Sequence, residues 1–181
     1  ACGEKTDLAT DMSTTPTETT TVDAAAADPA AGIRDAQDFV NAVGQASLVE
    51  IRASEMALEK GRNAQLKTFA QKMIDEHKAA GDMLKAAASS AALAPPPKTL
   101  DDFHMRRIND LVETDGDADF HADYAALQVD AHNDAIKVVE DYSKDANALP
   151  QLKTFADEIL PTLAAHKVDA EKVRDAVTKN G

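Results

Sequence analysis

The sequence has 181 residues, no tryptophan, few aromatic residues and a formal net charge of −13. An acidic surface repels phosphate groups, so the composition argues against nucleic-acid binding and against direct adsorption to anionic lipid. The abundant alanine, lysine and glutamate favour helix over strand. No run of about 18 apolar residues is present to span a bilayer as a helix.

Residues 1–32 differ in composition from the rest of the chain. Ala1-Cys2-Gly3 resembles the end of a bacterial lipobox, and Cys2 is the single cysteine. The following residues are mostly threonine, alanine and acidic side chains, which bury too little apolar surface to offset the entropy of ordering. We expect a disordered tether whose lipidated Cys2 anchors an exported protein in the cell envelope, at the outer membrane; a cysteine placed there by chance is the alternative.

Helical periodicity begins at Ile33 and predicts a hairpin of two long helices. The first helix is expected over 34–60 and the second over 64–92. Gly61-Arg62-Asn63 forms the turn between them, with glycine ending the first helix. Pro95-Pro96-Pro97 ends the second helix, because proline lacks the backbone donor that a helix needs.

The remaining sequence predicts a short helix and a second hairpin. The short helix is expected over 100–112, before a turn at 115–117. Two long helices are expected over 118–144 and from Leu149-Pro150 to residue 178, with a kink at Pro161 in the second.

A repeated six-residue sequence indicates that the two hairpins are related and pack around one centre. Gln-Leu-Lys-Thr-Phe-Ala occurs at 65–70 and at 151–156, opening the second helix of each hairpin, and a histidine follows each copy. Four long helices with one longer crossover are typical of ferritin-like bundles. The expected fold is therefore all-α: a ferritin-like four-helix bundle over 33–180 whose crossover carries the short helix.

One ionisable residue lies within the apolar stripe of each long helix when positions are placed 100° apart. These residues are Glu50, His77, His132 and His166. Three imidazoles and one carboxylate suit a transition metal ion such as zinc, iron or copper. The same group could instead be a proton-linked switch, or a hydrogen-bonded layer that only fixes the register of the helices.

A di-iron oxidase site is disfavoured by the residues around the histidines. That site needs a glutamate three positions before each of two histidines, on two different helices. Ile74, Val129 and Leu163 occupy the three positions in question here. With no hydrolase motif either, no catalytic residue is assigned, and the sequence leans away from an enzyme.

Other polar residues have weaker patterns. Tyr124 and Gln128 precede His132 on the same side of their helix and could support a metal ligand, or could lie at the edge of the core. Asp75 and Glu76 are expected to point to solvent. His104 and His121 are expected at the surface, and Met83 is expected in the core.

Four segments together resemble the bacterial domain-of-unknown-function 4142 family, whose members are exported proteins with a ferritin-like bundle. The resemblance covers about 36–175, with Glu76 and His121 standing where the family usually has aspartate. It implies the fold, the export and the set of four inward residues, but no activity. The segments are Phe39 to Glu50, Phe69-Ala70-x-x-Met73-Ile74-x-x-His77, Phe120-x-x-x-Tyr124-x-x-x-Gln128-Val129-x-x-His132, and Phe155-Ala156 with Leu160-Pro161-x-Leu163-x-x-His166.

The sequence thus predicts an exported, lipid-anchored helical bundle with an inward glutamate and three histidines that bind a metal ion. The alternative is a non-catalytic structural or stress-associated protein of the envelope, in which the polar cluster only fixes packing. Apart from the membrane reached through the lipid anchor, no partner is indicated.

Overall fold

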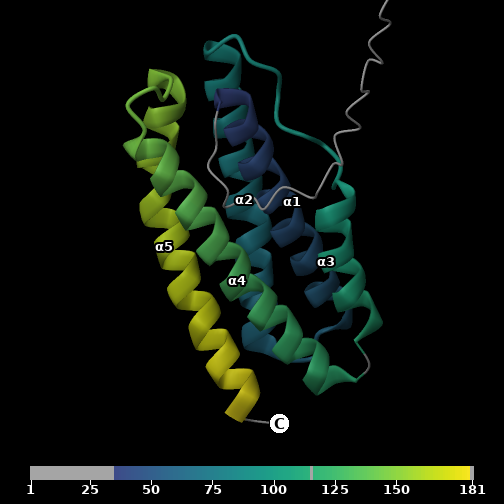
Figure 1. The fold of residues 1–181 in the computed structure, drawn as a ribbon. Helices are drawn as coiled ribbons and strands as arrows, with labels where there is room; N and C mark the ends of the chain where they lie inside the picture. Colours follow the sequence, from purple (N-terminus) through teal and green to yellow (C-terminus); the bar gives the residue numbers. More distant parts are fainter. Residues whose placement is uncertain (1–34, 115, 180–181) are drawn as a thin grey trace, which may run out of the picture.

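The computed structural model describes residues 35–114 and 116–179, and the predicted tether 1–32 with Cys2 lies outside them. Within these ranges the chain forms helices and no strands, which confirms the all-α prediction (Figure 1). None of the described helices is both long and apolar enough to cross a membrane. The helices are α1 (Ala36–Lys60), α2 (Ala64–Ser90), α3 (Asp102–Glu113), α4 (Asp117–Lys144) and α5 (Pro150–Lys179).

Side-chain caps fix where three of these helices begin. The carboxylate of Asp35 accepts a hydrogen bond from the backbone of Asp38, at 2.8 Å, at the start of α1. Asn63 caps α2 and Asp101 caps α3 in the same way. At its other end α2 stops at Ser90, two residues earlier than predicted, and Ala92 adopts a positive φ of 56° that a helix cannot continue through.

The four long helices form a bundle in which α1 packs against α2 and α4, and α5 packs against the same two helices. The connection after α2 returns along the bundle through α3, so α2 and α4 run in the same direction (Figure 1). Helix α3 lies outside the bundle, mainly against α1. The predicted four-helix bundle with a short helix in its crossover is confirmed.

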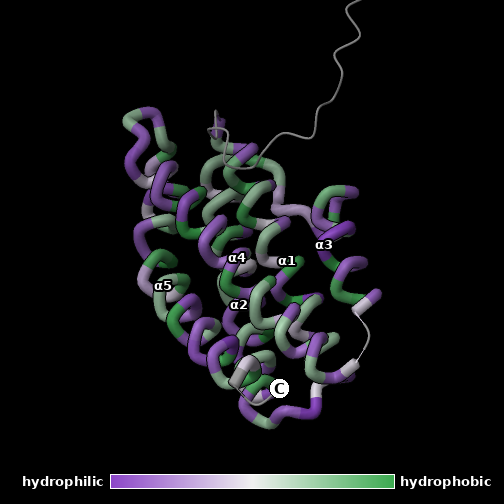
Figure 2. The backbone as a smooth tube through the Cα atoms, turned by 60° about the horizontal axis from the view of Figure 1, so that its bottom comes forward, coloured by the Kyte–Doolittle hydropathy of each residue, from purple (hydrophilic) through white to green (hydrophobic). Residues whose placement is uncertain are grey.

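The core consists of two apolar clusters at opposite ends of the bundle. One gathers around Phe39, which stacks on Tyr142 with ring centroids 4.0 Å apart. The other gathers around Phe69 and Tyr124, whose rings meet edge to face. Along each helix hydrophilic and hydrophobic residues alternate, as expected when one side is buried (Figure 2). Met83 was predicted in the core, but it is 41% exposed.

The crossover is tied to α1 by close packing and hydrogen bonds. The amide of Gln45 donates to the carbonyl of Thr99 at 3.0 Å and accepts from the backbone of Asp101 at 3.1 Å. The preceding residue, Gly44, lies so close to the proline run that a Cβ atom there would sit 2.6 Å from the Cδ of Pro97. Glycine is therefore needed at this position by the close approach of the crossover.

We expect Gly44→Ala to lower the free energy of unfolding by about 1–3 kcal/mol, because the added methyl group overpacks the contact with Pro97. Gly81→Ala is a matched control, since a Cβ atom there would meet nothing within 4 Å. The control should instead raise the unfolding free energy by about 0.5–1 kcal/mol through its better helix propensity. Urea denaturation measures both, and equal shifts in the two variants would contradict this packing.

Candidate metal centre

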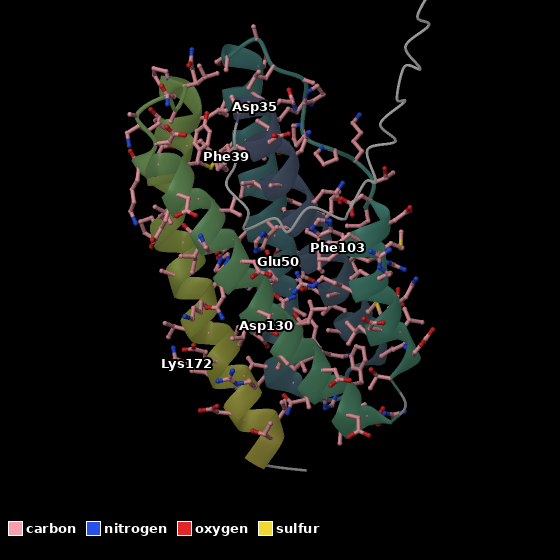
Figure 3. The ribbon with its side chains drawn as sticks, viewed as in Figure 1. Asp35, Phe39, Glu50, Phe103, Asp130 and Lys172 are labelled. Carbon is pink, nitrogen blue, oxygen red and sulfur yellow. The ribbon has the colours of Figure 1, made fainter. Side chains whose placement is uncertain are left out.

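The four ionisable residues predicted to point inward meet in one layer midway along the bundle. Glu50 comes from α1, His77 from α2, His132 from α4 and His166 from α5, and none is more than 4% exposed. Figure 3 labels Glu50 well inside the ribbon. The two apolar clusters lie on either side of this histidine–glutamate layer, so water has little access to it.

The three imidazole rings surround a common point. Their centroids are 5.3–5.5 Å apart, and one possible ligand atom from each ring lies within 4.8 Å of the others. Glu50 contacts two of the rings: its Oε2 lies 2.7 Å from Nε2 of His77, and its Oε1 lies 3.4 Å from Nδ1 of His132. The carboxylate and the rings therefore form one compact group.

Outer contacts hold two of the rings by one nitrogen each. Nδ1 of His132 donates to the backbone carbonyl of Gln128 at 2.8 Å, one turn earlier on α4. Because a carbonyl can only accept, the proton is on Nδ1 and the lone pair is on Nε2. Nε2 of His166 donates to the carboxylate of Glu76 on α2, which leaves the lone pair of His166 on Nδ1.

His77 has a weaker contact of the same kind. The hydroxyl of Ser47 donates to the backbone carbonyl of His77 at 3.4 Å and lies 3.5 Å from its Nδ1. Nε2 of His77 faces Oε2 of Glu50 at 2.7 Å, and a proton on Nε2 pairs the ring with the carboxylate, so a metal ion at Nε2 would take the place of that proton. All three rings thus turn one nitrogen outward to a partner.

The atoms that remain without a hydrogen-bond partner are those in the middle of the layer. The 2.7 Å contact between Glu50 and His77 is an ion pair but does not meet hydrogen-bond geometry. Buried polar atoms nearly always have partners, so these are the atoms that a bound ion or ordered water would satisfy. The buried atoms are Nε2 of His77, Nε2 of His132, Nδ1 of His166, both carboxylate oxygens of Glu50, and Oε1 of Gln128.

The charges in the layer are strongly coupled. Burial is the largest influence on Glu50 and by itself would raise its pKa, but the positive charge that His77 and His132 carry when protonated outweighs it and lowers the pKa to about 2. For His166, burial lowers the pKa, while the hydrogen bond to Glu76 opposes this. The carboxylate is therefore ionised at neutral pH, and nearby positive charge stabilises this ionised form in the buried layer.

Tyr124 and Gln128, which the sequence predicted as supporting residues, both contact Ser54, and Gln128 also contacts the layer itself. The hydroxyl of Tyr124 lies 2.9 Å from Oγ of Ser54. The amide of Gln128 lies 3.4 Å from that same oxygen and 3.4 Å from the backbone carbonyl of Glu50. Gln128 therefore touches both Glu50 and His132, whereas Tyr124 contacts neither and fixes Ser54.

Sequence reasoning missed three residues of the site. Glu76 was predicted to point to solvent. It is instead about half exposed, at the edge of the buried side of α2, and its long side chain reaches His166 on α5. Ser47 and Ser54 lie three residues before and four residues after Glu50, on the same side of α1. This i, i+3, i+7 spacing of polar residues was a signal that could have found them.

The other two histidines lie outside the layer. His104 pairs with Asp101, its helix cap, at 2.7 Å. His121 accepts a hydrogen bond from the backbone of Arg62 at 3.1 Å. Both are partly buried, although the surface was expected for them, and they supply histidines outside the layer for comparison.

We expect the metal-free protein to lose stability in acid partly through Glu50. Its pKa in the folded state lies below the ordinary value of 4.5, so the ionised group stabilises the fold fully above pH 4.5, and this contribution is lost as the pH falls towards 2. The loss should amount to about 2 kcal/mol by pH 3 and about 3 kcal/mol by pH 2. Denaturant unfolding between pH 7 and 3, with a chelator present, should show a flatter profile for Glu50→Gln; equal slopes would contradict the assignment.

Comparison with known proteins identifies the family. The family model described as Domain of unknown function (DUF4142) matches residues 20–173, which is most of the chain. No curated protein and no solved structure matches, so the ferritin-like character of the bundle stays a prediction. The chain therefore belongs to the DUF4142 family, as its sequence segments suggested, and it carries a buried glutamate–histidine cluster at the centre of a helical bundle.

Proposed function

We propose that the histidine–glutamate layer binds a single transition metal ion of the zinc, iron or copper class. The observation that carries the proposal is the arrangement of the ring nitrogens: each histidine has one nitrogen beside an outer partner and a second, buried nitrogen that faces the layer and has no hydrogen bond. Histidines that bind metals usually have this arrangement, because the outer hydrogen bond fixes the tautomer and the orientation of the ring.

The geometry suits such an ion after a small contraction. Metal–nitrogen bonds of about 2.1 Å in a tetrahedral site place the ligand atoms about 3.4 Å apart. The ring nitrogens now lie within 4.8 Å of one another, so the rings would need to move together by about an ångström. Glu50 adds an oxygen ligand, and a bound cation would replace the positive charge that now holds its carboxylate ionised.

The donor set favours one ion over two. A second metal would need further carboxylates, and the positions one turn before the histidines carry Ile74, Val129 and Leu163, all buried and apolar. A bound metal would supply Lewis-acid or redox chemistry at the layer. The residues of this chain would hold the ion, exclude bulk water and keep the rings in one tautomer.

The second candidate function is a structural one, in which the layer fixes packing and no ion binds. It is favoured by the ion pair between Glu50 and His77, which forms without a metal. A buried polar layer can specify which helices pair and in what register. The two candidates differ in whether metal affinity depends on the histidines.

We expect purified protein to bind close to one equivalent of Zn²⁺ and to melt at a higher temperature when Zn²⁺ is in excess. His132→Ala should remove this binding, and His121→Ala, a histidine of the same helix outside the layer, should retain it. Elemental analysis after dialysis and thermal melts measure both. Binding that survives in His132→Ala, or no binding in the unaltered protein, would leave only the structural candidate.

A second pair of variants keeps all the buried histidines, so it still tests the site if His132→Ala fails to fold. Glu76→Gln weakens the charged partner of His166 without emptying the core, and should reduce zinc affinity about 10–100-fold. Asp75→Asn changes the neighbouring exposed carboxylate, which contacts only its own helix, and should leave the affinity unchanged. Equal affinities in both variants would mean that Glu76 does not support a metal ligand.

We also propose that the chain is exported and anchored in the cell envelope by a lipid on Cys2. The support is the Ala1-Cys2-Gly3 motif, followed by the tether composition of residues 3–32. Intact mass measurement of the protein from its native envelope should show added acyl mass that Cys2→Ser lacks. An unmodified Cys2 in membrane fractions would contradict the anchor.

A further inference from the structure

A pocket of about 190 Å³ lies beside the histidine–glutamate layer, between α1 and α2. Glu50 and His77 form part of its lining, whereas His132 and His166 do not. The other walls are mainly apolar, with Leu84 of α2 and Phe155 and Ile159 of α5 among them. This pocket therefore adjoins the layer on the side of Glu50 and His77.

The opposite end of the pocket meets the protein surface. Lys78 and Asp82 belong to its lining and are both exposed. Gly81 lies between them on α2, and a Cβ atom there would meet nothing within 4 Å. The proline run of the crossover, Pro96-Pro97, forms another part of the lining. The pocket therefore extends from the protein surface to Glu50 and His77, whose inward polar atoms are themselves buried.

The size and polarity of the pocket limit what could occupy it. Its volume is comparable to cavities of about 150 Å³ that bind benzene in proteins. A polar group among the apolar walls would be left without a partner, which is costly in a buried site. A ligand would therefore place its apolar part against Leu84 and Phe155, and its polar end against Glu50 and His77.

We propose that this pocket admits a small molecule with a benzene-sized apolar body and one metal-coordinating head, which binds the metal ion from the side of Glu50 and His77. The inference rests on the proposed metal site. Three imidazoles and one oxygen of Glu50 would hold the ion, and the head would add as a fifth ligand from the side of the pocket. The site would then exchange this fifth ligand while the protein ligands stay in place.

The test uses Co²⁺ as a coloured substitute for the metal and thiophenol as the probe, under nitrogen. Thiophenol joins a benzene ring to a thiol, which releases its proton to the buffer on binding, and the resulting thiolate gives an intense charge-transfer absorption when it binds Co²⁺. Titration of Co²⁺-loaded protein should give a saturable band. Gly81→Leu should weaken thiophenol binding at least tenfold by filling the pocket, while leaving Co²⁺ affinity unchanged within threefold.

The control variant is Ala79→Leu, which places the same side chain on an exposed position of α2 that does not line the pocket. It should bind thiophenol as the unaltered protein does. A second measurement needs no variant: 4-tert-butylbenzenethiol has a similar head and a larger body, so it should bind the unaltered protein at least tenfold more weakly than thiophenol does.

The outcomes separate the inference from the proposed function. If Co²⁺ binds but thiophenol gives no band, the pocket inference is wrong and the metal site stands. The same holds if Gly81→Leu binds thiophenol as tightly as the unaltered protein, or if the larger thiol binds equally well. If Co²⁺ does not bind to the unaltered protein at all, both proposals are overturned.

Discussion

The burial of one carboxylate determines how the centre of this bundle is built. Glu50 has no exposed surface and lies between two apolar clusters, where an isolated charge would be very costly. The fold compensates by bringing a histidine from each of the other three long helices to the same level. The residues one turn before those histidines are apolar, so the compensation comes from the imidazoles and not from further charged groups of α2, α4 and α5.

That compensation is incomplete in the protein alone, and this links the architecture to function. Outer partners such as Glu76 and the carbonyl of Gln128 satisfy the outward nitrogens of the rings, while the inward nitrogens and the oxygens of Glu50 have no hydrogen bond. A layer that only fixed helix register would be more stable with every polar atom satisfied. The pocket beside Glu50 adds a second reason to regard the layer as a site, because it brings a mainly apolar cavity up to Glu50 and His77.

The sequence predicted the fold and the meeting of the four inward residues because both follow from helical periodicity. The position of Glu50 or His132 on its helix depends only on spacing from nearby apolar residues. The role of Glu76 could not be predicted in this way, because it depends on how closely α5 approaches α2. Met83 was misplaced because it lies at the edge of the stripe next to Leu84, where a small rotation of the helix decides exposure. The pocket depends on the path of the crossover, which periodicity does not determine.

The most direct test of the central claim is a crystal structure of Zn²⁺-loaded protein with anomalous diffraction at the zinc edge. A single strong peak should lie about 2.1 Å from Nε2 of His77, Nε2 of His132 and Nδ1 of His166, with an oxygen of Glu50 as a further ligand. Peaks confined to surface carboxylates, with the buried layer holding only protein atoms, would contradict the metal site and favour a purely structural polar layer.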